Sequence, residues 1–302
     1  MWVGFSVAIV AAISLDLGVL HRKAHRITLK EALAESAGWI GLALAFNTWV
    51  YISMGHQAGL EFLAGYLVEK SLSIDNIFLF LLIFQGMDVP ASAQHKVLYY
   101  GIVGALVMRA IFIFGGVALL NRFHFVLYVF AAILIFTAVR MLWPGRHKMQ
   151  PQRNWLVRIV RRFVPMTQEF KGANFFVRRG SKWCATPLLL ALVAVEATDI
   201  VFAVDSVPAV LAITRDTFIA FSSNVFAILG LRALYFALAD LLPRFRFLQP
   251  GLAAILLFTG AKMLASDRIR IPTGVSLGVI IGIMALMVVA SLLWPRKNRR
   301  RT

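Results

Sequence analysis

The stretch VEKSLSIDNIFLF, residues Val68–Phe80, places Glu69, Lys70 and Asp75 inside a long apolar run. Similar apolar runs recur along the whole chain, each near the length of about 20 residues that crosses a bilayer as a helix. Of the 302 residues, 60% are hydrophobic and only 15% are charged, a composition that soluble domains do not have. The sequence therefore predicts an all-α, polytopic membrane protein whose spans carry a few ionisable residues.

We predict nine membrane-spanning helices within a single transmembrane domain. The first lacks the basic start and the small-residue cleavage site of a signal peptide, so we expect it to be retained. The one long connection, residues 144–183, is rich in Arg and Lys and poor in acidic residues. The predicted spans cover residues 2–20, 33–54, 62–85, 98–119, 123–143, 184–212, 217–240, 246–264 and 272–294.

The basic residues predict the orientation of the chain, because cytoplasmic loops of membrane proteins are enriched in Lys and Arg. With residues 144–183 in the cytoplasm, the N-terminus lies outside and the basic C-terminal tail lies inside. The loops on the outer side then carry few basic residues, namely Arg122, Arg215, Arg268 and Arg270.

The formal net charge of +17 would indicate nucleic-acid binding in a soluble protein. Here the basic residues cluster between spans and at the C-terminus, where topology and attraction to anionic lipid explain them. We therefore expect a lipid bilayer, with anionic lipid at residues 144–183, and no nucleic acid as partners. Within this loop, Asn154–Pro165 suits either an amphipathic helix on the inner leaflet or a solvated basic linker. The single cysteine, Cys184, excludes an intrachain disulfide.

Two pairs of segments indicate an internal repeat. AAILIFTAVRML (Ala131–Leu142) recurs as AAILLFTGAKML (Ala253–Leu264), with eight of twelve positions identical. EKSLSIDN (Glu69–Asn76) aligns with DIVFAVDS (Asp199–Ser206). The matched polar positions favour duplication over a chance likeness of apolar sequence.

The repeat predicts two copies of a three-span unit, residues 62–143 and 184–264, flanked by the spans 2–20, 33–54 and 272–294. Because three is an odd number, successive copies must enter the membrane from opposite sides. Inverted repeats of this kind are typical of transporters, whose substrate site lies near the bilayer midplane at the repeat interface.

Five carboxylates lie inside the predicted repeat units. Three of them belong to the stretch VEATDIVFAVDSVPAVLAI (Val195–Ile213) in the second copy. A charged residue at the centre of a spanning helix costs about 2.5–3.5 kcal/mol on insertion scales, so these residues must be protonated, paired with a cation or open to water. Each alternative makes them candidates for a metal site, and they are Glu69, Asp75, Glu196, Asp199 and Asp205.

The spacing of these acids limits how they can converge. Glu69 and Asp75, six residues apart, lie about 120° apart around a straight helix and about 9 Å along it. Either a helix breaks near Asn76 or Pro208, or the acids form stacked sub-sites along a path. Oxygen ligands suit hard divalent cations such as Mg²⁺, Ca²⁺ and Mn²⁺ better than Zn²⁺ or Cu⁺. Further residues that can support the site are Asp16, Ser73, Asn76, Thr198, Ser206, Arg109 and Arg232.

Arg109 and Arg232 also have a purely structural interpretation. They occupy matching places in the two copies, one residue out of register. Each could pair with an intramembrane acid and hold helices together. Such pairs would still leave several carboxylates without a basic partner.

The acidic motifs resemble those of the TerC family of integral membrane proteins, most closely its Alx-type branch. The resemblance rests on FLAGYLVEKSLSIDNIFLFLLIF (Phe62–Phe84), MRAIFIFGG (Met108–Gly116) and the Val195–Ile213 stretch, and it covers most of the chain. It implies a bacterial inner-membrane protein of metal-ion homeostasis, related to tellurium resistance and, for this branch, to Mn²⁺ export. The family's acidic metal positions fall on the same five carboxylates. Selectivity for Mn²⁺ follows from the resemblance alone.

We therefore expect a transporter that moves Mn²⁺ outward, with no tightly bound cofactor and no enzymatic activity. Two alternatives remain open. The protein could be a membrane scaffold or stress-resistance factor that recruits partners through its basic loop, residues 144–183. It could also be an intramembrane enzyme that uses Asp75 and Asp205, although we find no further catalytic motif.

Overall fold

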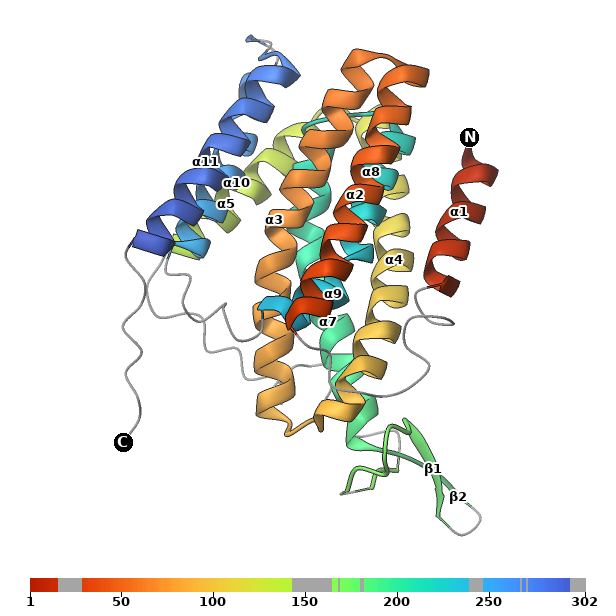
Figure 1. The fold of residues 1–302 in the computed structure, drawn as a ribbon. Coiled ribbons are helices and arrows are strands. Elements are labelled where there is room, and N and C mark those ends of the chain that lie inside the picture. The colour runs from red at the N-terminus through yellow and green to blue at the C-terminus, as the bar shows by residue number, and fades with distance from the viewer. Residues whose placement is uncertain are drawn as a thin grey trace.

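A computed structural model describes residues 1–15, 29–142, 165–167, 169–179, 182–238, 247–266, 268–269 and 271–293. It is almost wholly helical, so the predicted fold class, an all-α polytopic membrane protein, is confirmed (Figure 1). The helices are α1 (Trp2–Leu15), α2 (Leu29–Met54), α3 (His56–Gly86), α4 (Ala91–Arg122), α5 (Val126–Leu142), α7 (Pro187–Leu211), α8 (Thr217–Leu229), α9 (Leu231–Leu238), α10 (Leu248–Ala265) and α11 (Thr273–Leu293).

Each predicted span coincides with a helix, and the span 217–240 corresponds to α8 and α9, which are separated at Gly230. Helices α3 and α4 extend beyond their predicted spans at the N-terminal end, since α3 begins at His56 and α4 at Ala91. Within the described part of the chain, five helical segments are long and apolar enough to cross a membrane. They are Lys30–Met54, Ala91–Arg122, Pro187–Leu211, Thr217–Ala237 and Thr273–Ser291.

The start of the predicted span 184–212 is wrong, because its first residues belong to a β-hairpin. Strand β1 (Phe176–Arg179) pairs antiparallel with β2 (Lys182–Ala185), with Arg178 opposite Trp183. The helix begins only at Pro187, a residue that favours the first helical position. The apolar run continues into the strand, so hydropathy alone does not mark this boundary.

Phe175, the residue before β1, packs on the N-terminal part of α4. Its ring lies 5.3 Å from the ring of Tyr100, and the Lys96 ammonium lies 5.0 Å from the centre of the Phe175 ring. The alternative of an amphipathic helix over Asn154–Pro165 concerns residues that lie outside the described ones, apart from Pro165.

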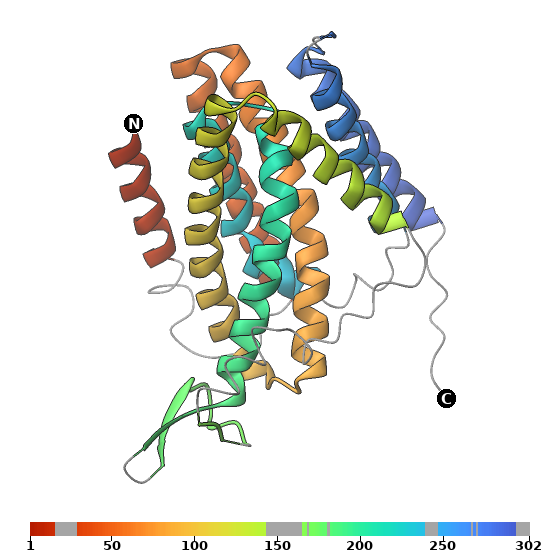
Figure 2. The ribbon, with the colours of Figure 1, turned by 180° about the vertical axis from the view of Figure 1, so that it is seen from behind.

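The helices form a central bundle with a second group packed on one side (Figure 2). Helices α3, α4, α7 and α8 pack against one another, with α2 on α3 and α9. Helices α5, α10 and α11 form the second group, while α1 lies at the opposite edge (Figures 1 and 2).

The helix pairings follow the pattern that two related copies would produce. In the predicted repeat, α3, α4 and α5 correspond to α7, α8–α9 and α10. The contacts α3–α7 and α5–α10 join corresponding helices, and the contact α4–α7 has its counterpart in α3–α8. The division into two inverted units stays a prediction.

The repeated AAIL motifs meet where α5 packs on α10. Ala131, Leu134 and Ala253 are fully buried there. Gly260 lies so close to α5 that a Cβ atom would stand 3.1 Å from the Ala131 carbonyl oxygen and 2.9 Å from a side-chain carbon of Ile135. A residue without a side chain is therefore needed at position 260 for the two helices to approach this closely.

Large apolar side chains cover the outer faces of the bundle. Val3 on α1 is 80% exposed and Leu286 on α11 is 71% exposed. Buried polar groups lie inside the bundle, among them Glu69, Arg109 and Asn224. This arrangement, apolar outside and polar inside, is what a bilayer requires of a helical protein.

Candidate functional site

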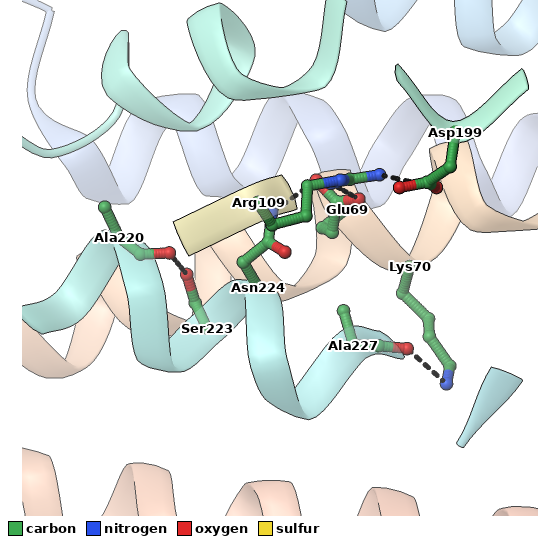
Figure 3. A network of polar contacts seen from close by, with 8 residues as sticks. All are labelled: Glu69, Lys70, Arg109, Asp199, Ala220, Ser223, Asn224 and Ala227. Carbon is green, nitrogen blue, oxygen red and sulfur yellow. Dashed lines mark hydrogen bonds and ion pairs between the residues drawn. The ribbon is translucent and has the colours of Figure 1, made fainter. Parts of the chain in front are cut away.

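Arg109 on α4 is the centre of the buried polar network (Figure 3). Its guanidinium forms an ion pair with Glu69 of α3, and its second terminal nitrogen lies 3.8 Å from Asp199 Oδ1 on α7. The three side chains are 1%, 0% and 4% exposed, in the order Arg109, Glu69, Asp199. Opposite charges at this depth must compensate one another, because removing one partner strands a buried charge. The network therefore ties α3, α4 and α7 together.

Helix α8 completes the network through Asn224. Its side-chain amide donates to Glu69 Oε2 at 3.0 Å, while Arg109 takes Glu69 Oε1, so both oxygens of this carboxylate have partners. The Ser206 side chain of α7 also lies close to Glu69. Sequence reasoning missed Asn224. The polar triplet Ser222–Asn224 inside an apolar span was the signal that could have found it.

A cavity of about 430 Å³ opens beside this network, between α3, α5, α7 and α10. Asp205 lines it from α7, and its Oδ1 accepts a hydrogen bond of 2.7 Å from the Thr137 hydroxyl of α5. Most of the wall is apolar, and the polar side chains in it are Asn76, Arg109, Thr137, Arg140, Asp205, Ser206 and Gln249. The cavity lies between helices of the two predicted repeat units.

Thr137, Arg140 and Gln249 were not predicted as site residues. Thr137 belongs to a Phe-Thr pair that the repeat preserves as Phe258 and Thr259, so its recurrence was a usable signal. Arg140 is exposed and its charge acts on Asp205 from the rim of the cavity.

Several buried oxygens near the cavity have no hydrogen-bond partner among the described residues. They include Asn76 Oδ1 and Asp199 Oδ2, on side chains that are 2% and 4% exposed. Both residues also line a small void of about 10 Å³. Buried polar atoms in proteins are normally partnered, so these two oxygens are available as ligands. Ser73, fully buried on α3, has an unpartnered hydroxyl as well.

Glu196 lies on the α4-facing side of α7, one helical turn before Asp199, and the charges of the two acids interact. The Glu196 side chain is half-buried and packs on Gly104, where an added Cβ atom would overlap the carboxylate. The Thr198 hydroxyl donates to the Val195 carbonyl oxygen of its own helix at 2.7 Å and so contributes nothing to the cavity. Asp16 lies outside the described residues, and for Asp75 only the helical backbone is described.

The described carboxylates do not gather into one cluster. Among the side chains that the structure describes, which exclude Asp75, no group of three or more His, Cys, Asp or Glu could hold a metal ion. Helix α3 is continuous past Asn76, and α7 is continuous past Pro208, so this conformation lacks the predicted helix break. The alternative of separate sub-sites along a path agrees with it. The assignment of five metal-site carboxylates stays a prediction.

Both intramembrane arginines pair with acids, as their structural interpretation predicts. Arg232 on α9 bonds Glu35 of α2 at 3.0 Å, an acid outside the predicted set. Lys70 points away from its neighbour Glu69 and donates to the Ala227 carbonyl oxygen at the end of α8, at 3.2 Å (Figure 3). Its ammonium lies beside Gly230, where α8 and α9 separate.

Comparison with known protein families matches residues 54–300 to the integral membrane protein TerC family. This chain belongs to the TerC family. The TerC match begins at the end of α2, so it contains the whole Glu69–Arg109–Asp199 network but not Glu35. The Arg109 network is thus built from the TerC region alone, while the Arg232 pair joins that region to α2.

Relatives from several bacteria cover nearly the whole chain. An uncharacterized membrane protein of Myxococcus xanthus is 49% identical over 98% of this chain and 93% of its own length. A Shigella flexneri protein named as a candidate membrane-bound redox modulator, Alx, is 44% identical over 95% of this chain and 92% of its own length. An uncharacterized membrane protein of Rickettsia bellii is 40% identical over 98% of both chains. No solved structure matches this chain.

Proposed function

We propose that this TerC-family protein transports a divalent metal ion, and that the ion is Mn²⁺, moved outward across a bacterial inner membrane. One observation carries the proposal. The cavity of about 430 Å³ between the two predicted repeat units brings Asp205 and Asn76 together with Arg109, which holds Glu69 and Asp199. Transporters built from inverted repeats bind their substrates at such an interface.

The donor atoms at this interface suit a hard cation. Asp205, Asn76 and Ser206, which all carry side-chain oxygens, line one cavity. Asp199 Oδ2 is a further oxygen without a hydrogen-bond partner, next to Asn76 across the small void. Mg²⁺, Ca²⁺ and Mn²⁺ prefer such ligands. The choice of Mn²⁺ among them rests on the resemblance to the Alx-type branch.

The proposal also includes the direction of metal transport and its coupling to protons. The basic residues favour an N-terminus outside and a C-terminus in the cytoplasm. The carboxylates would hold the ion in one state and take up protons, or open to the other side, in the next. The contacts between corresponding helices, α3–α7 and α5–α10, are the surfaces on which the two units would rock. We propose no enzymatic activity and no tightly bound cofactor.

The test is Mn²⁺ flux into or out of proteoliposomes, with the wild type beside Asp205→Asn and Asp75→Asn. Both variants should insert and fold yet lose transport, because each removes a carboxylate but keeps the side-chain volume. Asp88→Asn is the matched control, since Asp88 is exposed in the α3–α4 turn with φ 52°, a conformation that asparagine adopts readily. Full transport by Asp205→Asn would contradict the proposed mechanism, and Mg²⁺ and Ca²⁺ as competitors would measure selectivity.

One observation favours the scaffold alternative. On the hairpin, Trp183 is 65% exposed and Phe176 is 51% exposed, and two arginines stand beside them. A scaffold that recruits partners through this segment would lose its function on replacement of Trp183 and Phe176 by Ser. A transporter would keep its Mn²⁺ flux in the same variant, so the flux assay separates the two.

A further inference from the structure

We infer that Arg109 is an internal cation that holds the carboxylates of the ion site in this conformation and gives them up when the metal ion enters. The inference rests on the proposed function. It concerns Arg109 because this buried arginine contacts two of the predicted metal-site acids, Glu69 and Asp199. In this view the guanidinium and the transported ion exclude each other from the same oxygens.

Arg109 pairs unequally with its two acids. Glu69 is fully engaged, with one oxygen on Arg109 and the other on Asn224. Asp199 is held only weakly, since its Oδ1 lies 3.8 Å from the guanidinium and its Oδ2 has no hydrogen-bond partner within the described part of the chain. An approaching cation would therefore meet Asp199 first and would compete with Arg109 from there.

A further acid, Asp205, is available to the Arg109 guanidinium in the same cavity. The Arg109 side chain lines the same cavity as Asp205, and its Nε has no hydrogen-bond partner among the described residues. Asp205 accepts from the neutral Thr137 hydroxyl, and the Arg140 side chain, whose charge acts on Asp205, is exposed at the surface. The guanidinium can thus turn toward Asp205 without leaving the protein interior and without becoming an unpaired buried charge.

The charges of the site would also balance when one divalent cation is bound. Glu69, Asp199 and Asp205 together with Arg109 carry a formal net charge of two negative units, which one divalent cation neutralises. With the ion between Glu69 and Asp199, and Arg109 beside Asp205, every charge has an opposite neighbour. A low-dielectric interior strongly favours such local neutrality. Among the described side chains, the further charged groups around the network are Glu196, which is half-buried, and Arg140.

The second copy supplies a matched control. Arg232 occupies the corresponding position but pairs with Glu35 of α2, and it does not line the cavity. Replacing Arg232 removes a buried arginine of the same kind without freeing Glu69 or Asp199.

The experiment measures Mn²⁺ affinity by titration calorimetry on the purified full chain in detergent. Arg109→Gln should bind Mn²⁺ about tenfold more tightly than the wild type, equivalent to about 1.4 kcal/mol, because the competing charge is gone. Its flux in proteoliposomes should fall, since no internal cation displaces the ion. Arg232→Gln should leave Mn²⁺ affinity unchanged. A purely structural Arg109 would give no gain in affinity, so unchanged or weaker binding by Arg109→Gln would overturn the inference.

A second variant covers the case in which Arg109→Gln does not fold. Arg109→Lys keeps a positive charge beside Glu69 and Asp199, so it leaves no buried acid without a counter-charge. An ammonium lacks the planar fork of the guanidinium and holds two carboxylates less firmly, so Arg109→Lys should bind Mn²⁺ several-fold more tightly than the wild type, and unchanged or weaker binding would again overturn the inference.

The outcomes distinguish the two levels of the proposal. If the wild type transports Mn²⁺ and Asp205→Asn does not, while Arg109→Gln gains no affinity, the transporter stands and the internal cation is rejected. If neither the wild type nor Arg109→Gln binds or moves Mn²⁺, both are rejected.

Discussion

Arg109 and Arg232 occupy matching places in the two predicted repeat units, yet they have different partners. Arg109 lies between the units, where it contacts one acid from each, Glu69 and Asp199. Arg232 is also buried, but it pairs with Glu35 of the flanking helix α2. Equivalent positions in sequence thus serve different contacts, because the helix that each arginine faces depends on how the units are packed.

The matching threonines of the two units, Thr137 and Thr259, also have different partners. Thr137 on α5 donates to Asp205 across the helix interface, at 2.7 Å. Its counterpart Thr259 on α10 donates to the Ile255 carbonyl oxygen of its own helix, at 2.8 Å. In this conformation Thr137 makes a contact between the two units, whereas Thr259 bonds within its own helix. A transporter that alternates between two states needs the units to differ in each state, so the asymmetry is consistent with the proposed mechanism.

The largest expected effect is on the free energy of unfolding, when each arginine loses its acidic partner. Glu69→Gln removes the ion-pair partner of a fully buried Arg109, and breaking such a pair costs about 3–5 kcal/mol. Glu35→Gln removes an ion-pair partner of Arg232, and because the Glu35 side chain is 13% exposed we expect a smaller loss of about 1–3 kcal/mol. Thermal unfolding in the same detergent measures both. Equal losses would show that the two arginines are equally buried in practice and would remove the distinction.

The next effect concerns the interface between the corresponding helices α5 and α10. Gly260→Val would press a branched side chain into Ala131 and Ile135 and should cost about 1–3 kcal/mol through overpacking. Gly278→Val on α11 is the control, because a Cβ there meets nothing within 4 Å, and its effect should stay within about 0.5 kcal/mol. If Gly260→Val proves as harmless as the control in thermal unfolding, α5 and α10 are not tightly packed in solution.

The smallest effect compares the two threonines. Thr137→Val keeps the shape of the side chain but leaves Asp205 without its hydroxyl partner, a bond worth about 1 kcal/mol, so Mn²⁺ flux should change about fivefold. Thr259→Val removes only a bond within α10 and should leave flux at the wild-type level. A change of the same size in both variants would show that the two units contribute alike to transport.

Sequence patterns located the helices well and the polar partners poorly. In the part of the chain that the structure describes, each helix falls on a predicted apolar span. The hairpin at Phe176–Ala185 was missed because its four-residue strands carry too short an alternation and merge with the following apolar run. Its position became visible only through the pairing of the strands.

The candidate site shows where prediction from sequence stops. Residue types alone identified the acids inside the spans and predicted that arginines pair with some of them, because charges inside a bilayer have few stable arrangements. Which acid pairs with which arginine could not be read from the sequence. The polar triplet at Asn224 and the repeated Phe-Thr pair at Thr137 marked these residues as unusual but did not show which carboxylate each would contact, and Gln249 had no such signal. Those residues are ordinary polar side chains until the packing brings them to a carboxylate or a cavity.

The sequence by itself determined an all-α membrane protein of the TerC family with acids and arginines inside its spans. Only the tertiary structure decided that Arg109 joins Glu69 to Asp199, that Arg232 turns to Glu35, and that Asp205 opens into a cavity. The physical reason is that hydropathy and periodicity fix each helix and its faces. The rotation of each helix about its axis, and the neighbour that each face meets, are set by close packing between segments far apart in the chain.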